Sequence, residues 1–166
     1  FLESHPEIGI CGPKVLNSDG SLQKQCRRGE PTPWAVISYF TRLNRLFPDS
    51  KLFGGYLLNY MDEDETHPVA GVSGSCMLIR RAVIDQIGYL DERFFAYQED
   101  VELALRSRRA GWKCVMAPAA RGLHLGFGSN RPFAVGGSYA DYFNARNRIA
   151  MLMTTLPSAE WRGHWR

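Results

Sequence analysis

The sequence lacks the features that mark several specialised classes of protein. Its four cysteines form no C-x-x-C pair, no signal peptide opens the chain, and no apolar run approaches the roughly 20 residues that cross a bilayer. The net charge of +3 is too small to indicate a nucleic-acid partner. These absences exclude a disulfide framework, a cysteine-based zinc site and a membrane-spanning helix. Scattered thiols are typical of a reducing compartment, so we expect a cytoplasmic protein whose cysteines are mostly buried.

What is present fits an ordinary globular chain. The 166 residues, 45% of them apolar and 22% charged, are enough for a single domain, 1–166, with a real core. The sequence shows no internal repeat and no low-complexity tract. Because the first residue is Phe rather than Met, we expect the chain to begin inside a longer sequence or to have been processed.

The first third of the chain predicts a hairpin and a helix. A buried strand at Ile8–Leu16, a turn at 17–20 and a returning strand at 21–28 form the hairpin. A helix at 34–47 follows, introduced by prolines and ended by Pro48. Its apolar residues recur at helical spacing, so the helix either faces the core or lies on a membrane or a partner.

The rest of the chain alternates between strands and helices, which indicates an α/β fold. The expected segments are a loop at 51–68, a strand at 69–79 with small residues at its centre, a short helix at 82–87, a strand at 112–117 and a final helix at 139–156. Gly88 is expected to close the short helix, and Pro118 to stop the later strand.

The most informative stretch is an aromatic run at 94–97 that ends in two adjacent carboxylates, Glu99 and Asp100. A helical pattern begins immediately after them and stops near Gly111. Acidic residues at a helix start are favoured by the helix dipole, so capping is one interpretation of the pair. A role in acid–base chemistry is the other.

Two further sites offer ligands for a metal. Asp62 and Asp64 fit a D-x-D pattern, and two carboxylates at this spacing can reach one hard cation. However, they lie within an acidic run, 62–65, which is more typical of a solvated loop. His124 lies in a glycine-rich loop at 122–129, as either a ligand or a structural residue.

Several of these segments occur together in a recognisable order. The stretches 72–81 (VSGSCMLIRR), 88–103 (GYLDERFFAYQEDVEL) and 109–112 (RAGW), followed by His124, resemble the C-terminal half of family 2 glycosyltransferases, close to the rhamnosyltransferase-like members. The resemblance spans roughly residues 5 to 150. It implies a partial GT-A (Rossmann-like) α/β fold that lacks the N-terminal nucleotide-binding units.

The resemblance also implies an activity. A member of this family transfers a hexosyl or rhamnosyl group, with inversion, from a nucleotide-sugar donor to a glycan or lipid-linked acceptor in cell-wall or polysaccharide biosynthesis. The second acid of the pair, Asp100, then acts as general base, because a carboxylate must remove the proton of the attacking hydroxyl. Glu99 shapes the acceptor site. Gly74 and Ser75, with the aromatic residues Phe95 and Tyr97, line the substrate, although burial under the loop explains the two aromatic residues equally well.

The implied cofactor is a divalent metal, Mn²⁺ or Mg²⁺. The resemblance assigns His124 one of two roles: it binds the metal, or it contacts the diphosphate that the metal holds. The family's D-x-D motif belongs upstream of residue 1, and Asp62 and Asp64 follow the hairpin and cannot replace it. We therefore expect the 166-residue chain not to transfer sugar by itself. A non-catalytic glycosyltransferase-like binding or scaffold module remains the alternative.

Two further expectations concern partners. A sheet separated from its donor half exposes an edge and an apolar face, which predicts self-association. Peripheral membrane contact, if the protein makes it, is assigned to residues 34–47 or 161–166.

Overall fold

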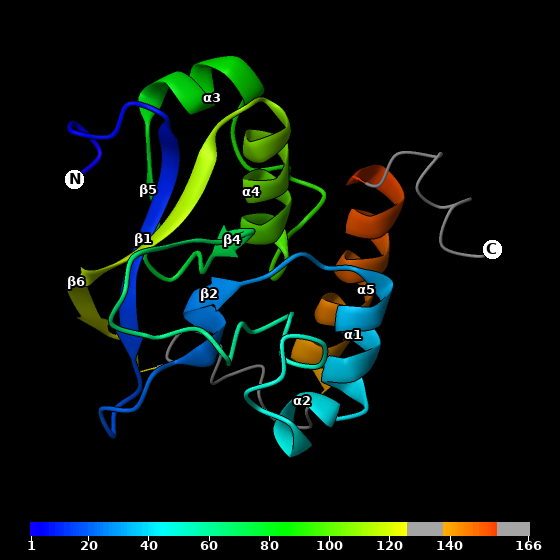
Figure 1. Ribbon diagram of the computed structural model, residues 1–166. Helices are drawn as coiled ribbons and strands as arrows, with labels where there is room; N and C mark the ends of the chain where they lie inside the picture. The colour runs from blue at the N-terminus through cyan, green and yellow to red at the C-terminus, as the bar shows by residue number, and fades with distance from the viewer. Residues whose placement is uncertain (126–137, 156–166) are drawn as a thin grey trace.

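The computed structural model describes residues 1–125 and 138–155 and has a mixed α/β architecture (Figure 1). Its main sheet has the strand order β3-β6-β1-β5, and a second sheet pairs β2 with β4. The strands are β1 (Ile8–Leu16), β2 (Arg27–Arg28), β3 (His67–Pro68), β4 (Gly71–Val72), β5 (Leu78–Ile79) and β6 (Lys113–Leu123). Strands β1 and β6 are parallel, and the other pairs are antiparallel.

The helices cover one side and the top of the main sheet in the view of Figure 1. They are α1 (Pro33–Phe40), α2 (Leu43–Leu46), α3 (Arg81–Ile87), α4 (Glu99–Arg109) and α5 (Ser138–Thr155), with a 3₁₀ turn η1 (Lys24–Cys26) before β2. Helix α4 contributes Leu103 and Ala104 to a core that also contains Ile10, Val72 and Met116. This packing holds the middle of α4 against β4.

The local signals for several elements are confirmed. The strand Ile8–Leu16 and the helices α3, α4 and α5 lie within one or two residues of their expected positions. Gly88 and Gly111 follow α3 and α4 with φ of 80° and 96°, a region in which glycine carries no steric penalty. All four cysteines are free, and three of them are buried, as expected.

The expected hairpin is wrong beyond its turn. Residues 17–20 do turn, and the N–H of Asn17 donates to the carbonyl of Ser21. The return makes only a single bridge, Leu16 to Leu22, before the chain enters η1. The neighbours of β1 are instead β6 and β5, because the hydrophobic strand from the far end of the chain pairs along its full length.

The helix expected at 34–47 is two helices. Arg42 has a left-handed conformation, with φ of 62°, and it separates α1 from α2. Thr32 caps α1 by accepting a hydrogen bond from Ala35. The expectation of a core-facing helix is also wrong for much of the segment, because Phe40 and Leu46 are 63% and 70% exposed.

Two other strand boundaries differ from expectation. The segment 69–79 is not one strand but two short pieces, β4 and β5, separated by a turn around Gly74. Strand β6 continues past Pro118, because its pairing with β1 is irregular there: partners shift from Gly12 with Met116 to Lys14 with Arg121. A proline in such an irregularity removes no ladder hydrogen bond.

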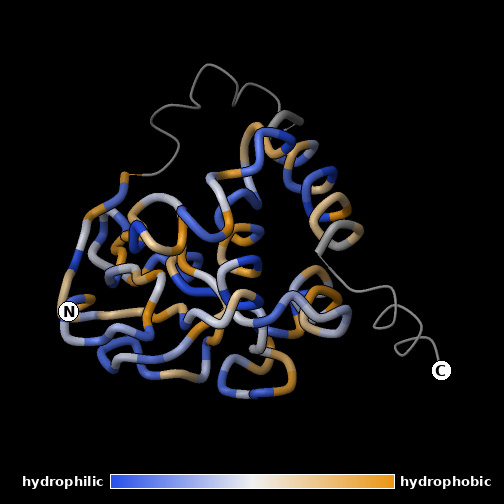
Figure 2. The backbone as a smooth tube through the Cα atoms, turned by 90° about the horizontal axis from the view of Figure 1, so that it is seen from above, coloured by the Kyte–Doolittle hydropathy of each residue, from blue (hydrophilic) through white to orange (hydrophobic). Residues whose placement is uncertain are grey.

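The loop at 51–68 is more than a surface connection. Tyr56, Leu57 and Leu58 are all buried in its middle. Within the described residues, no helix is long and apolar enough to cross a membrane. Figure 2 shows hydrophobic and hydrophilic residues alternating along the helical turns.

Candidate functional site

The acid pair lies where the chain makes an unusual turn into α4. Tyr97 and Gln98 both have left-handed backbone conformations, with φ of 67° and 71°. Such conformations cost a non-glycine residue roughly 1–3 kcal/mol each. The turn places Glu99 and Asp100 in the first turn of α4, with no side-chain cap from Gln98. Backbone strain therefore sets the direction of the two carboxylates.

Asp100 is held by two backbone N–H groups. Its Oδ2 accepts from Gly74 at 2.9 Å, and its Oδ1 accepts from Val101 at 2.8 Å. The second contact belongs to the helix start, so the capping interpretation is partly correct. The first contact ties the carboxylate to a loop 26 residues away in sequence. The side chain is 7% exposed, and each oxygen keeps lone pairs for another donor.

Gly74 approaches both acids. A Cβ atom added to Gly74 would lie 3.4 Å from Cβ of Asp100 and 3.8 Å from Oε1 of Glu99. Gly74 itself is exposed, so this loop connects the acid pair to the surface of the molecule. The exposed Ser75 follows it, and its hydroxyl hydrogen-bonds to Ser73. The structure thus brings Gly74, Glu99 and Asp100 together and places Ser75 one residue away.

Glu99 is half-buried beside Asp100. Its Oε2 is buried and has no hydrogen-bond partner among the described residues. Burial raises the pKa of the Glu99 carboxyl, the neighbouring Asp100 charge adds to the rise, and Arg28 opposes it. A carboxyl in this environment favours its protonated form and can then donate a hydrogen bond.

We expect Glu99 to make stability pH-dependent. Its folded-state pKa is raised above the unfolded value of about 4.3, so the folded state loses stability as the pH rises from that value through the raised one. Glu99→Gln removes this loss. The free energy of unfolding of the variant minus that of the wild-type protein should therefore be more positive at pH 7 than at pH 4. Urea titrations of both proteins at the two pH values measure this. The same variant-minus-wild-type value at both pH values would contradict it.

Two arginines lie over the ring of Tyr56, and one of them, Arg28, interacts with the charge of Asp100. The guanidinium carbons of Arg28 and Arg148 lie 6.0 and 5.6 Å from the ring centroid of Tyr56. Burial acts to lower the pKa of Arg28, but the charge of Asp100 and other groups outweigh it and raise the pKa. The Nε atoms of both arginines are buried without a hydrogen-bond partner among the described residues. Sequence reasoning did not assign Arg148 to the site, because its contact with Tyr56 spans more than 90 residues.

Helix α5 holds the turn that carries the acids. Asn147 is fully buried, and its Nδ2 donates to the carbonyls of Ala96 and Tyr97 at 2.7 and 2.9 Å. Gln98 alone separates these two residues from the acid pair. Sequence analysis missed Asn147, since an asparagine within an amphipathic helix carries no signal of its own.

Replacing Asn147 with alanine should destabilise the protein by about 1–3 kcal/mol, because the carbonyls of two half-buried residues lose the donor that the buried Asn147 amide supplies. The free energy of unfolding from urea titration measures this. Met153→Ala is the matched control, because Met153 is exposed on the same helix and should change stability little. Equal effects of the two substitutions would rule out this role for Asn147.

The two aromatic residues of the run have different environments. Phe95 is 75% exposed and lies 5.7 Å from the ring of Phe143 on α5. Burial under the loop therefore does not explain Phe95. Tyr97 is half-buried in the left-handed turn. Phe95 is thus available to a ligand near the acid pair.

His124 follows the end of β6 and is exposed. Its Nδ1 lies 3.0 Å from Oε1 of Gln23, and its backbone N–H donates to Leu16. The contact with Gln23 uses Nδ1, so Nε2 is the ring nitrogen that a metal would use. No group of three metal-binding side chains occurs among the residues described. Gly126 and Gly128 of the glycine-rich loop lie outside the described ranges.

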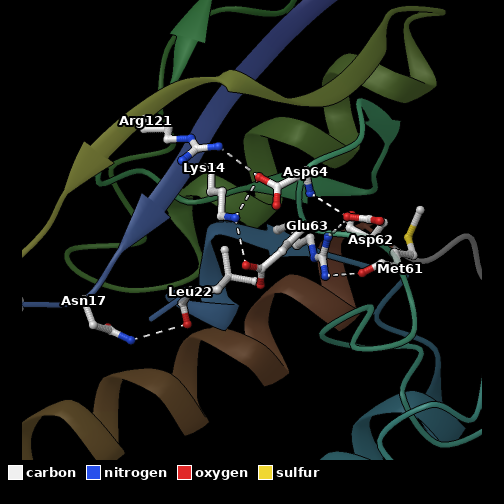
Figure 3. A network of polar contacts seen from close by, with 9 residues as sticks. Lys14, Asn17, Leu22, Met61, Asp62, Glu63, Asp64 and Arg121 are labelled. Atoms are coloured by element: carbon white, nitrogen blue, oxygen red, sulfur yellow. Dashed lines mark hydrogen bonds and ion pairs between the residues drawn. The ribbon is translucent and has the colours of Figure 1, made fainter. Parts of the chain in front are cut away.

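The acidic run at 62–65 forms ion pairs with basic side chains. The buried Lys14 Nζ contacts Oε1 of Glu63 at 2.8 Å and Oδ1 of Asp64 at 2.9 Å, and Arg121 adds a contact to Asp64 at 3.2 Å (Figure 3). The hydrogen bond from Lys14 lowers the pKa of Asp64. Asp62 accepts the backbone N–H of Asp64. Asp64 is thus paired with Lys14 and Arg121, whereas Asp62 accepts a backbone hydrogen bond.

Comparison with known proteins supports the resemblance. Residues 23–153 match the family described as "Glycosyl transferase family group 2". An N-acetylglucosaminyl-diphospho-decaprenol L-rhamnosyltransferase of Mycobacterium tuberculosis is 30% identical over 97% of this chain and 49% of its own length. A low-salt glycan biosynthesis hexosyltransferase of Haloferax volcanii is 30% identical over 84% of the chain and 40% of its own length.

A third relative, an O-antigen biosynthesis protein of Myxococcus xanthus, is 31% identical over 83% of the chain and 10% of its own length. The chain thus spans about half or less of the curated relatives that it matches. The mixed α/β sheet described above is consistent with a partial GT-A domain. The family match covers most of the sequence, and the chain belongs to the family 2 glycosyltransferases.

Proposed function

We propose that this chain forms the acceptor side of an inverting glycosyltransferase, in which Asp100 is the general base. The observation that carries the proposal is the carboxylate of Asp100, fixed between the N–H groups of Gly74 and Val101 beside an exposed loop. A hydroxyl is a weak nucleophile, and a fixed carboxylate can remove its proton as it attacks the anomeric carbon. The two N–H contacts fix the direction of the carboxylate, so positioning contributes much of the rate.

The donor is a nucleotide-sugar, and the acceptor is a glycan or a lipid-linked glycan. The names of the relatives support this assignment, since one is a rhamnosyltransferase and another a hexosyltransferase. Glu99, Gly74 and Ser75 border the acceptor hydroxyl, and the exposed ring of Phe95 offers a surface for a sugar, with Tyr97 behind it.

A divalent metal, Mn²⁺ or Mg²⁺, belongs to this proposal as a cofactor. The Nε2 atom of His124 fits one ligand position, and the remaining ligands must come from residues beyond those described. When bound, the metal would stabilise the diphosphate of the leaving group. The chain's own contribution is the acceptor base and its surroundings.

The test is a transfer assay on the full protein with dTDP-rhamnose or UDP-sugars and Mn²⁺ or Mg²⁺. We expect a product whose anomeric configuration is inverted relative to the donor, as read by proton NMR. A retained configuration would refute direct displacement with Asp100 as base. We expect no turnover from the 166-residue chain alone, and turnover by that chain would overturn this part of the proposal.

A further inference from the structure

Large apolar side chains are exposed along α1, α2 and the chain that follows them. Between positions 34 and 52, the side chains that are between 44% and 70% exposed are Trp34, Ile37, Phe40, Leu46, Phe47 and Leu52. We call these six residues the α1–α2 apolar surface. Figure 1 shows α1 and α2 at the side of the molecule away from β1 and β5. Single exposed apolar residues are common, but a group of them marks a surface that contacts something other than water.

The members of this group are held together. The three members on α1 recur every three residues, so they share one side of the helix. The ring centroid of Phe53 lies 5.9 Å from that of Trp34 and 5.1 Å from that of Phe47, which joins the start of α1 to the end of α2. The indole Nε1 of Trp34 donates to the carbonyl of Leu52 at 3.0 Å. These contacts make the exposed residues parts of one surface.

Basic side chains are interspersed with this surface along the chain. Arg42, Arg45 and Lys51 are all exposed, and Asp49 is the only acidic residue from 34 to 52. None of the three basic residues forms an ion pair with another part of the chain that the structure describes. The segment therefore combines exposed apolar groups with a net positive charge that the fold leaves uncompensated.

This charge distinguishes between the partners that an apolar surface can have. In a two-fold dimer the same surface of both copies meets, so these cations would lie opposite their own counterparts and repel one another. An anionic lipid bilayer instead offers negative head groups next to hydrocarbon, which matches both components of the surface. Within the described ranges no helix could cross a membrane, so the contact that fits is with the bilayer surface.

We propose that the α1–α2 apolar surface binds the surface of an anionic lipid bilayer. The apolar side chains enter the boundary between head groups and hydrocarbon, and Arg42, Arg45 and Lys51 contact lipid phosphates. Residues 34–47 are one of the two segments to which the sequence assigned peripheral membrane contact, and the other, 161–166, lies outside the described residues. The inference concerns where the protein binds rather than its chemistry, so it does not depend on Asp100 being the base.

Cosedimentation of the full protein with lipid vesicles tests the proposal. The vesicles contain phosphatidylcholine alone or phosphatidylcholine with an equal amount of anionic phosphatidylglycerol. The apolar variant is Phe40→Ser with Leu46→Ser, and its control is Tyr89→Ser with Leu90→Ser, at positions that are exposed elsewhere on the molecule.

A second variant tests the contribution of charge. It combines Arg45→Gln with Lys51→Gln, and its charge-matched control combines Arg81→Gln with Arg109→Gln. All four positions are exposed, so each substitution removes a charge from the surface without opening the core. Both controls keep the α1–α2 apolar surface and its cations intact.

We expect the wild-type protein to bind anionic vesicles more tightly than neutral ones, and to lose part of this preference as salt is raised. The charge variant should weaken binding to anionic vesicles roughly 30-fold, because each cation near an anionic bilayer contributes roughly fivefold. The apolar variant should weaken binding to both kinds of vesicle about tenfold or more, because less apolar area leaves water. Each control should change binding less than about twofold, because its positions lie away from the bound lipid.

Failure of the wild-type protein to bind anionic vesicles would overturn the proposal. Vesicle binding that is unchanged in the apolar variant would also overturn it, because the contact would then belong to another part of the protein. Light scattering of the full protein without lipid tests the other occupant. A wild-type dimer that the apolar variant converts to a monomer would assign the α1–α2 apolar surface to a second copy of the chain instead.

Discussion

Replacing Asp100 with asparagine should lower kcat by about two to four orders of magnitude, the range typical of a lost general base. Asparagine has nearly the same shape, and its amide oxygen can still accept one of the two N–H bonds that Asp100 receives from Gly74 and Val101. Its amide cannot take a proton from a hydroxyl at neutral pH. The acceptor should therefore bind while proton removal fails.

Initial rates of sugar transfer by the full protein measure this effect, with nucleotide-sugar binding measured in parallel. Donor binding should be nearly intact, because Asp100 lies at the acceptor side in this proposal. Asp85→Asn is the matched control, since Asp85 is exposed on α3 and pairs with the exposed Arg81. An unchanged kcat in Asp100→Asn would remove Asp100 from the role of base.

Replacing Gly29 with alanine should destabilise the protein by about 3 kcal/mol, the upper end of the usual cost of overpacking. A Cβ atom at Gly29 would lie 1.8 Å from the carbonyl oxygen of Gly55. Both groups belong to the backbone, so no side chain can rotate to relieve the contact. The N–H of Gly29 also donates to the carbonyl of Tyr56 at 2.9 Å, and this bond would be strained as the segments separate.

A cost of this size should lower Tm by about 6–12 °C for a chain of this length. Differential scanning calorimetry measures the change. Gly122→Ala is the control, because an added Cβ meets nothing within 4 Å at that position. Because Tyr56 stacks with Arg28 beside the acid pair, the Gly29 substitution should also slow sugar transfer. A Tm equal to that of the control would show that the two backbone segments separate without cost.

The elements that the sequence predicted well are those with strong local signals. Helix α4 has acidic residues in its first turn, an apolar stripe and a glycine after its end, and all three signals lie within 13 residues. The strand β1 and the helices α3 and α5 are similar cases. The proximity of Gly74 to Asp100 followed from the family resemblance, because no periodicity links positions 26 residues apart.

The elements that the sequence predicted poorly depend on distant partners. The return after the 17–20 turn has strand-like residues, but β6 takes the place beside β1 that a hairpin partner would occupy. Helical spacing continues through 34–47, yet the left-handed Arg42 divides the segment. The roles of Asn147 and Arg148 depend on α5 reaching the turn and rings formed much earlier in the chain.

The buried amide of Asn147 has a consequence for how this domain could be modified. The acid pair and the group that orients it are encoded about 50 residues apart, and only the second belongs to α5. A change that slides α5 by one turn, such as an insertion ahead of it, would leave every acidic residue and the central strands in place. It would nevertheless break the hydrogen bonds from Asn147 to the carbonyls of Ala96 and Tyr97, which support the left-handed turn. The carboxylates of the acid pair would then move away from Gly74. The position of α5 along its own axis thus determines whether Asp100 keeps the contact with Gly74 on which the proposed function rests.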